Sequence, residues 1–226
     1  MAFESSVDVK VEEKSLANRY TLKEEIFNSI THGVGALLSI AALVVLVAFA
    51  SAKGDAWEIV SFSIYGFTLF FLYLSSTLYH SVIYEKAKKV FRVFDHVSIY
   101  LLIAGSYTPI TLVAMRGTWG WTVFGVIWGL ALIGIALNII SLEKTKVVST
   151  ALYILMGWIL IIALKPMLQM MPPGLFAWLL AGGILYTFGV IFYVCKKIPF
   201  NHGIWHMFVL GGSVLHFLGF LFCLAV

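Results

Sequence analysis

Seven apolar runs of about 20 residues divide most of the chain, and short polar segments separate them. About 20 predominantly apolar residues are enough for an α-helix to cross the hydrocarbon core of a bilayer. The pattern therefore predicts an all-α membrane protein, built as a bundle of seven transmembrane helices. The predicted spans are residues 27–50, 56–82, 93–114, 119–140, 147–165, 174–195 and 202–225.

The first 26 residues differ from the rest because they are polar and mixed in charge. They contain no apolar core of the kind that a cleavable signal peptide requires. We therefore expect residues 1–26 to form a short N-terminal tail and residues 27–226 to form a single transmembrane domain. The first span then serves as its own insertion signal.

The composition agrees with this assignment, since 61% of residues are hydrophobic, 12% are charged and the mean hydropathy is +0.98. Soluble domains carry about 25% charged residues. The composition excludes an ordinary soluble protein, and the net charge of +4 therefore says little about nucleic acid. We expect membrane lipids as partners and no nucleic acid, and the sequence leaves the oligomeric state open.

Lysine and arginine are distributed unequally between the two sides of the predicted bundle. Three lie on the side away from the N-terminus: Lys53, Arg116 and Lys165. Twelve lie on the N-terminal side: Lys10, Lys14, Arg19, Lys23, Lys86, Lys88, Lys89, Arg92, Lys144, Lys146, Lys196 and Lys197. Because basic residues concentrate in cytoplasmic segments, we expect a multi-pass protein of the cell membrane with a cytoplasmic N-terminus and an external C-terminus.

Five ionisable residues fall at the predicted cytoplasmic ends of four spans. They are His32, His80, Asp95, His202 and His206. Ionisable groups inside spans are costly, usually face the bundle interior and mark functional sites. His216 is different, because ten residues of helix place it about 15 Å beyond His206.

Three of these residues form a candidate metal site. His202 and His206 are four residues apart, so they lie on one face of a helix. With His80 they supply three imidazoles and leave one coordination position open, which is the pattern of a catalytic zinc site. The sequence therefore predicts a Zn²⁺ ion held by these three residues. The alternative is that each histidine only hydrogen-bonds within the bundle.

Two further residues are candidates for the chemistry at this site. Asp95 can orient an attacking water and accept its proton. Ser76 lies one turn from His80 on the same helix face and can hydrogen-bond to the water or to a substrate carbonyl.

Four more residues are expected to support the ligands rather than bind the metal: His32, Asn28, Glu25 and His96. Glu25 can equally be an ordinary solvated charge near a helix N-terminus. His96 cannot face the same point as Asp95, because adjacent residues differ by about 100° of helix rotation. An interhelical hydrogen bond is the alternative role for His96.

Taken together, Ser76-x3-His80, Asp95 at the start of the third span and His202-x3-His206 resemble the signature of the CREST superfamily. Within it, the chain is most similar to the bacterial hemolysin III branch of the progestin and adipoQ receptor family, also called transmembrane homeostasis proteins. The resemblance extends from about residue 24 to the C-terminus. Supporting stretches are Glu25-x2-Asn28-x2-Thr31-His32-Gly33, residues 75–80, residues 94–96 and residues 105–109.

The resemblance implies seven helices, a zinc ion near the cytoplasmic face and the same three histidine ligands. It also implies that Asp95 and Ser76 act beside the ion. Relatives include adiponectin receptors and alkaline ceramidases, which resemble zinc-dependent lipid amide hydrolases. The N-terminal tail is shorter than the cytoplasmic region of the animal receptors. The family name implies lysis, but the sequence shows no amphipathic pore-forming segment.

These observations leave three functions open. The first is a zinc-dependent hydrolase of lipid amides or esters that acts in membrane homeostasis. The second is a non-enzymatic, zinc-stabilised sensor or regulator of membrane state. The third is a lytic pore or a transporter, which should place polar groups through the depth of the bundle. Here only His216, Asn138 and scattered serines and threonines lie away from the inner end.

Overall fold

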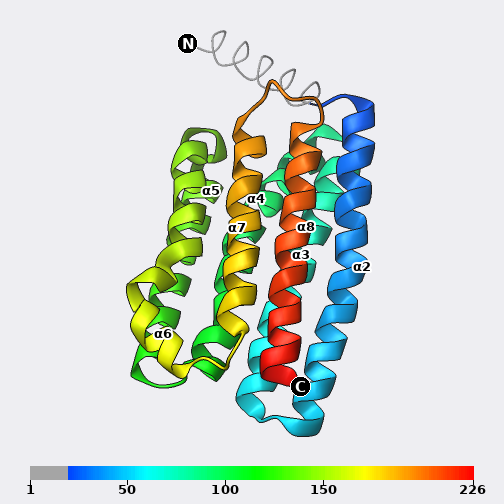
Figure 1. The fold of residues 1–226 in the computed structure, drawn as a ribbon. Helices are drawn as coiled ribbons and strands as arrows, with labels where there is room; N and C mark the ends of the chain where they lie inside the picture. Colours follow the sequence, from blue (N-terminus) through cyan, green and yellow to red (C-terminus); the bar gives the residue numbers. More distant parts are fainter. Residues whose placement is uncertain (1–19) are drawn as a thin grey trace.

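The computed structural model describes residues 20–226, which form an all-helical bundle (Figure 1). The α-helices are α2 (Leu22–Lys53), α3 (Ala56–Ser81), α4 (Glu85–Pro109), α5 (Thr118–Trp158), α6 (Leu164–Met170), α7 (Leu175–Val194) and α8 (Asn201–Phe220). Two π-helical segments, η1 (Ile110–Ala114) and η3 (Leu221–Ala225), and one 3-10 segment, η2 (Ile159–Ala163), extend them. The prediction of an all-α protein is confirmed for these residues. Most of the predicted tail, residues 1–26, lies outside the described residues.

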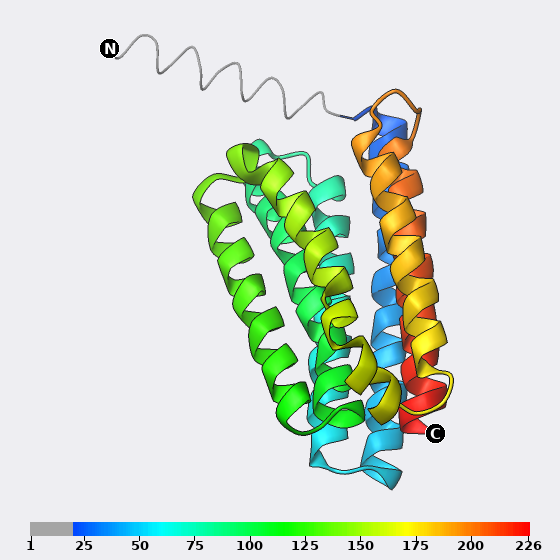
Figure 2. The ribbon, with the colours of Figure 1, turned by 60° about the vertical axis from the view of Figure 1, so that its left-hand side comes forward.

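Within residues 20–226, six helical segments are long and apolar enough to cross a membrane. One of them runs for 53 residues, from Thr118 to Met170. A straight α-helix of that length would measure about 80 Å, well over twice the hydrocarbon thickness. The segment is not straight, because Ser141 has non-helical backbone angles (φ −163°, ψ 89°) and the chain folds back there into two legs (Figure 2). The count of seven spans, with one span in each leg, stays a prediction, as does the orientation in the membrane.

Side-chain caps set where the first two helices begin. Thr21 and Glu24 form a capping box at the start of α2: the Thr21 hydroxyl accepts from the Glu24 backbone N–H, and Glu24 accepts from that of Thr21. This box starts α2 at Leu22, earlier than the apolar run predicted. At α3, Asp55 accepts from the backbone N–H groups of Trp57 and Glu58. The bond from Glu58 lowers the pKa of the Asp55 carboxyl below its usual value.

The packing order brings four helix ends together. α2 packs on α3 and α8, α4 packs on α3 and α5, and α7 packs on α8, whereas α5 and α7 touch at few places. In both ribbon views the start of α2 and the α7–α8 connection lie at one end of the bundle, and the C-terminus lies at the other (Figures 1 and 2). The end of α3 and the start of α4 share the first of these ends. The candidate site residues lie near these four helix ends.

Close helix contacts at α4 depend on residues without a side chain. A Cβ atom added at Gly134 in α5 would lie 2.2 Å from the Tyr100 ring of α4. One added at Gly105 in α4 would lie 2.0 Å from the Thr68 hydroxyl of α3. Small residues of this kind allow the backbones of membrane helices to approach closely.

We predict that Gly134→Val destabilises the bundle, because its side chain must displace the buried Tyr100 ring. Overpacking of this kind costs about 1–3 kcal/mol. The measurement is the apparent melting temperature of the detergent-purified protein. Gly129→Val is the matched control on the same leg of α5, since nothing lies within 4 Å of a Cβ atom added there. Equal losses in the two variants would contradict the packing argument.

Candidate metal centre

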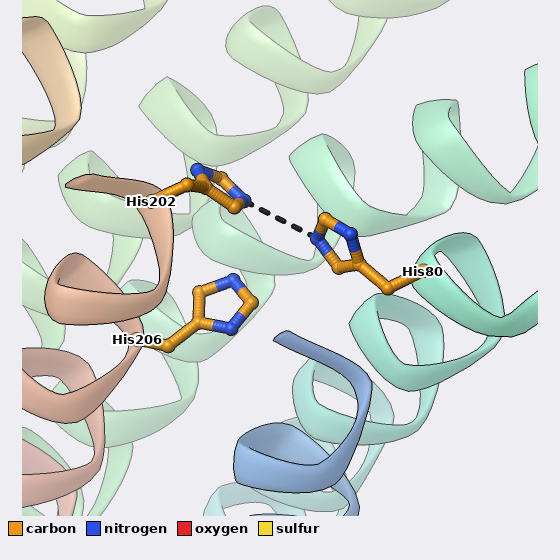
Figure 3. Close-up of side chains that lie close together, drawn as sticks. All are labelled: His80, His202 and His206. Carbon is orange, nitrogen blue, oxygen red and sulfur yellow. Dashed lines mark hydrogen bonds between the residues drawn. The ribbon is translucent and has the colours of Figure 1, made fainter. Parts of the chain in front are cut away.

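Three histidine side chains converge at the end of the bundle where α2 begins. His80 lies in the last turn of α3, and His202 and His206 lie in the first turns of α8. One ring nitrogen from each histidine lies within 4.8 Å of the others. The Nε2 atoms of His80 and His202 are 3.2 Å apart (Figure 3). The structure thus brings together the three residues that the spacing and the resemblance selected.

The three nitrogens fit a shared metal ion. Ligand nitrogens about 2.0–2.1 Å from a tetrahedral zinc ion lie about 3.4 Å from each other, and the His80–His202 separation is close to this value. The Nδ1 atom of His206 lies 3.3 Å from the Thr31 hydroxyl, which leaves Nε2 to face the other two histidines (Figure 3). That Nε2 atom is buried and has no hydrogen-bond partner among residues 20–226. The cluster can therefore hold a metal ion.

A carboxylate from α2 holds the ring of His80. The Nδ1 atom of His80 lies 2.6 Å from Glu25 Oε2, and the Lys88 ammonium donates to Glu25 Oε1 at 2.7 Å. A neutral imidazole that donates Nδ1–H to a carboxylate keeps Nε2 free as an acceptor, which is the form that binds a metal. The Glu25 side chain is 16% exposed, so it lies in the site rather than in open solvent.

α2 also places His32 and Asn28 beside α8. The His32 ring stacks on His206, with ring centroids 3.5 Å apart and planes 14° apart. Asn28 lies one turn earlier on α2 and contacts the start of α8 at Gly203, where an added Cβ atom would be 2.9 Å from its Oδ1 atom. The polar side-chain atoms of both residues are buried without a hydrogen-bond partner in the part of the chain described.

The two residues expected to carry the chemistry are both buried. Ser76 lies one turn before His80 on α3, and its hydroxyl has no partner among residues 20–226. Asp95 on α4 is 4% exposed and lines an apolar cavity that also reaches His32. Among the described residues, Asp95 is not one of the donors that cluster with the three histidines.

His96 and His216 lie away from the cluster of three histidines. The Nδ1–H of His96 donates to the Arg92 carbonyl within α4, and the same nitrogen is 3.5 Å from Asp95 Oδ2. This places the His96 ring next to Asp95. His216 lies deeper in α8, where its Nε2–H donates to the Leu179 carbonyl and its ring contacts Tyr186.

The sequence was compared with known proteins. Residues 20–217 match the family model described as "Haemolysin-III related". The chain belongs to this family. This result confirms the resemblance to the hemolysin III branch.

Relatives of the haemolysin-III family chain are bacterial and animal proteins. It is 51% identical over 203 residues to the hemolysin-3 homolog of Bacillus subtilis (strain 168), which covers 90% of this chain and 95% of that protein. It is also 51% identical over 201 residues to hemolysin-3 of Bacillus cereus, with coverages of 89% and 92%. The human monocyte to macrophage differentiation factor is 32% identical over 203 residues, with coverages of 87% and 83%. Family membership and the long apolar helices together show a multi-pass protein of the cell membrane.

Sequence reasoning missed three residues of this haemolysin-III family site. Thr31 contacts His206, Lys88 pairs with Glu25, and the Tyr20 ring lies over His202 and His80. Thr31 carried a usable signal, because it precedes His32 in a stretch that supports the resemblance. Lys88 carried only its charge, because the chain leaves α3 after Ser81 and begins α4 at Glu85, so helical spacing does not relate Lys88 to His80. Tyr20 carried none, since it falls in the polar segment before the first apolar run.

We predict that Glu25→Gln weakens binding of a metal ion, tested with Zn²⁺, because a neutral amide pairs more weakly than a carboxylate with the His80 N–H and the Lys88 ammonium. Loss of such a partner typically costs 10–100-fold in metal affinity. The measurement is the dissociation constant of Zn²⁺ in competition with a chromogenic chelator. Glu85→Gln makes the same chemical change in the cavity beside His80 and should leave the constant unchanged. Equal effects of the two substitutions would contradict the role given to Glu25.

Proposed function

We propose that this haemolysin-III family protein is a zinc-dependent hydrolase of a lipid amide or ester that acts in membrane homeostasis. The observation that carries the proposal is the convergence of His80, His202 and His206 beside an apolar cavity with the buried Asp95 in its wall. The cavity reaches the cluster through His32, whose ring stacks on His206.

The donor set favours zinc. Three neutral imidazoles with one open position are typical of catalytic zinc sites, whereas structural sites use four protein ligands. Among residues 20–226, three donors cluster and no fourth joins them. A zinc ion in such a site supplies Lewis acidity and lowers the pKa of water to about 7.

The apolar cavity supports a lipid substrate. Its volume of about 400 Å³ falls within the range of small-molecule sites. Its wall includes Asp95 and His32, whose ring stacks on His206, and extends to His216 deep in α8; the rest of the wall is mostly aliphatic and aromatic. The cavity lies between α4, α5 and α7, where α5 and α7 touch at few places. An acyl chain that lies in this cavity places its carbonyl near His32 and Asp95.

The residues divide the hydrolysis between them. The Asp95 carboxylate accepts a proton from the water that attacks the carbonyl carbon. The Ser76 hydroxyl donates a hydrogen bond to the carbonyl oxygen as negative charge develops there. Asp95 then returns the proton to the departing amine or alcohol as the C–N or C–O bond breaks. Water and the lipid amide or ester thereby give a fatty acid and an amine or alcohol.

One observation favours a second function, a zinc-stabilised sensor or regulator. The three histidines join α3 to α8, two helices whose backbones approach each other at few places. A metal that bridges them can stabilise one arrangement of the bundle without any reaction. In that case Asp95→Asn keeps full function and loss of a ligand does not.

We predict one zinc ion per chain in the detergent-purified protein. His206→Ala should lose it because two imidazoles remain, and Asp95→Asn should keep it because Asp95 is not a ligand. The measurement is metal content by mass spectrometry. His216→Ala is the matched control, since it removes a buried histidine of α8 outside the cluster. Absence of zinc from the wild type after zinc supplementation would contradict the proposed zinc site.

We predict that the zinc-loaded protein releases fatty acid from lipid vesicles. Asp95→Asn should slow release by about 10²–10⁴-fold, as expected for loss of a general base. Ser76→Ala should slow it by about 10²–10³-fold. The assay follows fatty acid from vesicles that contain ceramide or phosphoglycerides, with Asp55→Asn as a surface control. Zinc-loaded protein that releases no fatty acid from either lipid class would exclude the hydrolase and favour the sensor.

A further inference from the structure

A second cavity, called the polar cavity below, lies beside the metal centre and shares no lining residue with the apolar cavity. It has a volume of about 640 Å³ and lies between the start of α2 and the α3–α4 connection. Its wall includes the metal-facing histidine of α3, two carboxylates, two lysines and two serine hydroxyls: His80, Glu25, Glu85, Lys88, Lys89, Ser29 and Ser81. The metal centre therefore adjoins the apolar cavity at His32 and, at His80, a second cavity whose wall combines aliphatic residues with charged and hydroxyl side chains.

The ring of Tyr20 covers the metal centre on the side of the polar cavity. It stacks on His202 with ring centroids 5.0 Å apart and planes 28° apart, and its centroid is 5.6 Å from that of His80. Tyr20 also lines the polar cavity. One side chain thus contacts two of the three imidazoles and lies between this cavity and His202, whereas His80 already lines the cavity.

Tyr20 lies just outside the first helix. It precedes the N-cap Thr21, whose backbone is extended (φ −67°, ψ 158°), so its ring covers the site without being part of α2. The start of α2 is fixed separately, because Glu24 Oε1 accepts from the backbone N–H of Phe200 just before α8.

The two cavities differ as routes for an ion. Moving a hydrated cation through an apolar cavity is costly, since the wall cannot replace its water. The polar cavity can replace part of that water with the carboxylates of Glu25 and Glu85 and the hydroxyls of Ser29 and Ser81. The ion pair with Glu25 reduces the electrostatic repulsion between the Lys88 ammonium and an entering cation.

We propose that Tyr20 is a lid over the metal centre and that the polar cavity behind it is the route by which zinc and water exchange with the site. The inference rests on the proposed zinc site. Opening of the lid exposes His202 to the polar cavity, whose wall already includes His80, and closure covers His202 with an aromatic ring.

The test measures how fast zinc leaves the full-length, zinc-loaded protein in detergent after addition of an excess of the chelator 4-(2-pyridylazo)resorcinol. Tyr20→Ala should release zinc about tenfold faster than the wild type, in line with the effect of other residues that surround ligands. Tyr20→Phe keeps the ring and should match the wild type. Tyr84→Ala removes an exposed tyrosine at the same end of the bundle and should also match it.

Each outcome supports or overturns the role of Tyr20 as a lid. Equal rates for Tyr20→Ala and the wild type overturn it, and so does fast release from Tyr20→Phe, because the hydroxyl and not the ring would then matter. A zinc content below one per chain in Tyr20→Ala at saturating zinc also overturns it, since Tyr20 would then be needed to build the site. Failure of the zinc site itself is distinguishable, because the wild type would then contain no zinc at the start.

A second variant tests the route. Ser29 lies in the wall of the polar cavity, so Ser29→Trp narrows it without touching a ligand. In the double variant Tyr20→Ala/Ser29→Trp, zinc release should return toward the wild-type rate. Release as fast as in Tyr20→Ala alone would overturn the polar cavity as the route.

Discussion

Imidazoles buried in an apolar bundle need hydrogen-bond or metal partners, and this need explains why the histidine-bearing helix ends lie together. Unpaired polar groups in a membrane interior cost several kcal/mol each. Among residues 20–226, most buried side-chain atoms without a partner gather at one place, on Asn28, His32, Ser76, His202 and His206. A metal ion with its water offers partners to such a group. The end of α3 and the start of α8 meet there, and these two helix ends carry the three histidines that can share an ion.

α2 organises this centre although it supplies no ligand. Glu25 fixes the ring of His80, Thr31 contacts His206, and His32 stacks on His206. Glu25, Asn28 and His32 are three, four and seven residues apart along α2, so they lie on one helix face, and Thr31 borders that face. Gly203 lets α2 approach α8 closely enough for this, since an added Cβ atom would meet the Phe27 ring at 2.3 Å.

Helical periodicity made part of this site predictable. The spacing of His202 and His206 determines that they share a face, and alternating spans put His80 at the same depth. The contacts of Glu25 and Tyr20 were not predictable, because they depend on how α2 is rotated about its axis and on where its capping box starts it. The fold-back at Ser141 was predicted only as a boundary between apolar runs. The exact position of the fold-back within α5 depends on the backbone angles of Ser141 alone.

The ligands lie far apart along the chain, since His80 and His202 are 122 residues apart. Membrane helices are made and inserted from the N-terminal side, so α3 reaches the bilayer well before α8 is synthesised. Until then the His80 ring and its Glu25 partner have no second ligand to face. In the proposed metal site, binding by all three histidines therefore requires that α8 has been inserted and docked against α2. A cell that monitors such proteins could recognise an incomplete bundle by the exposed histidine layer that its last helix has yet to cover.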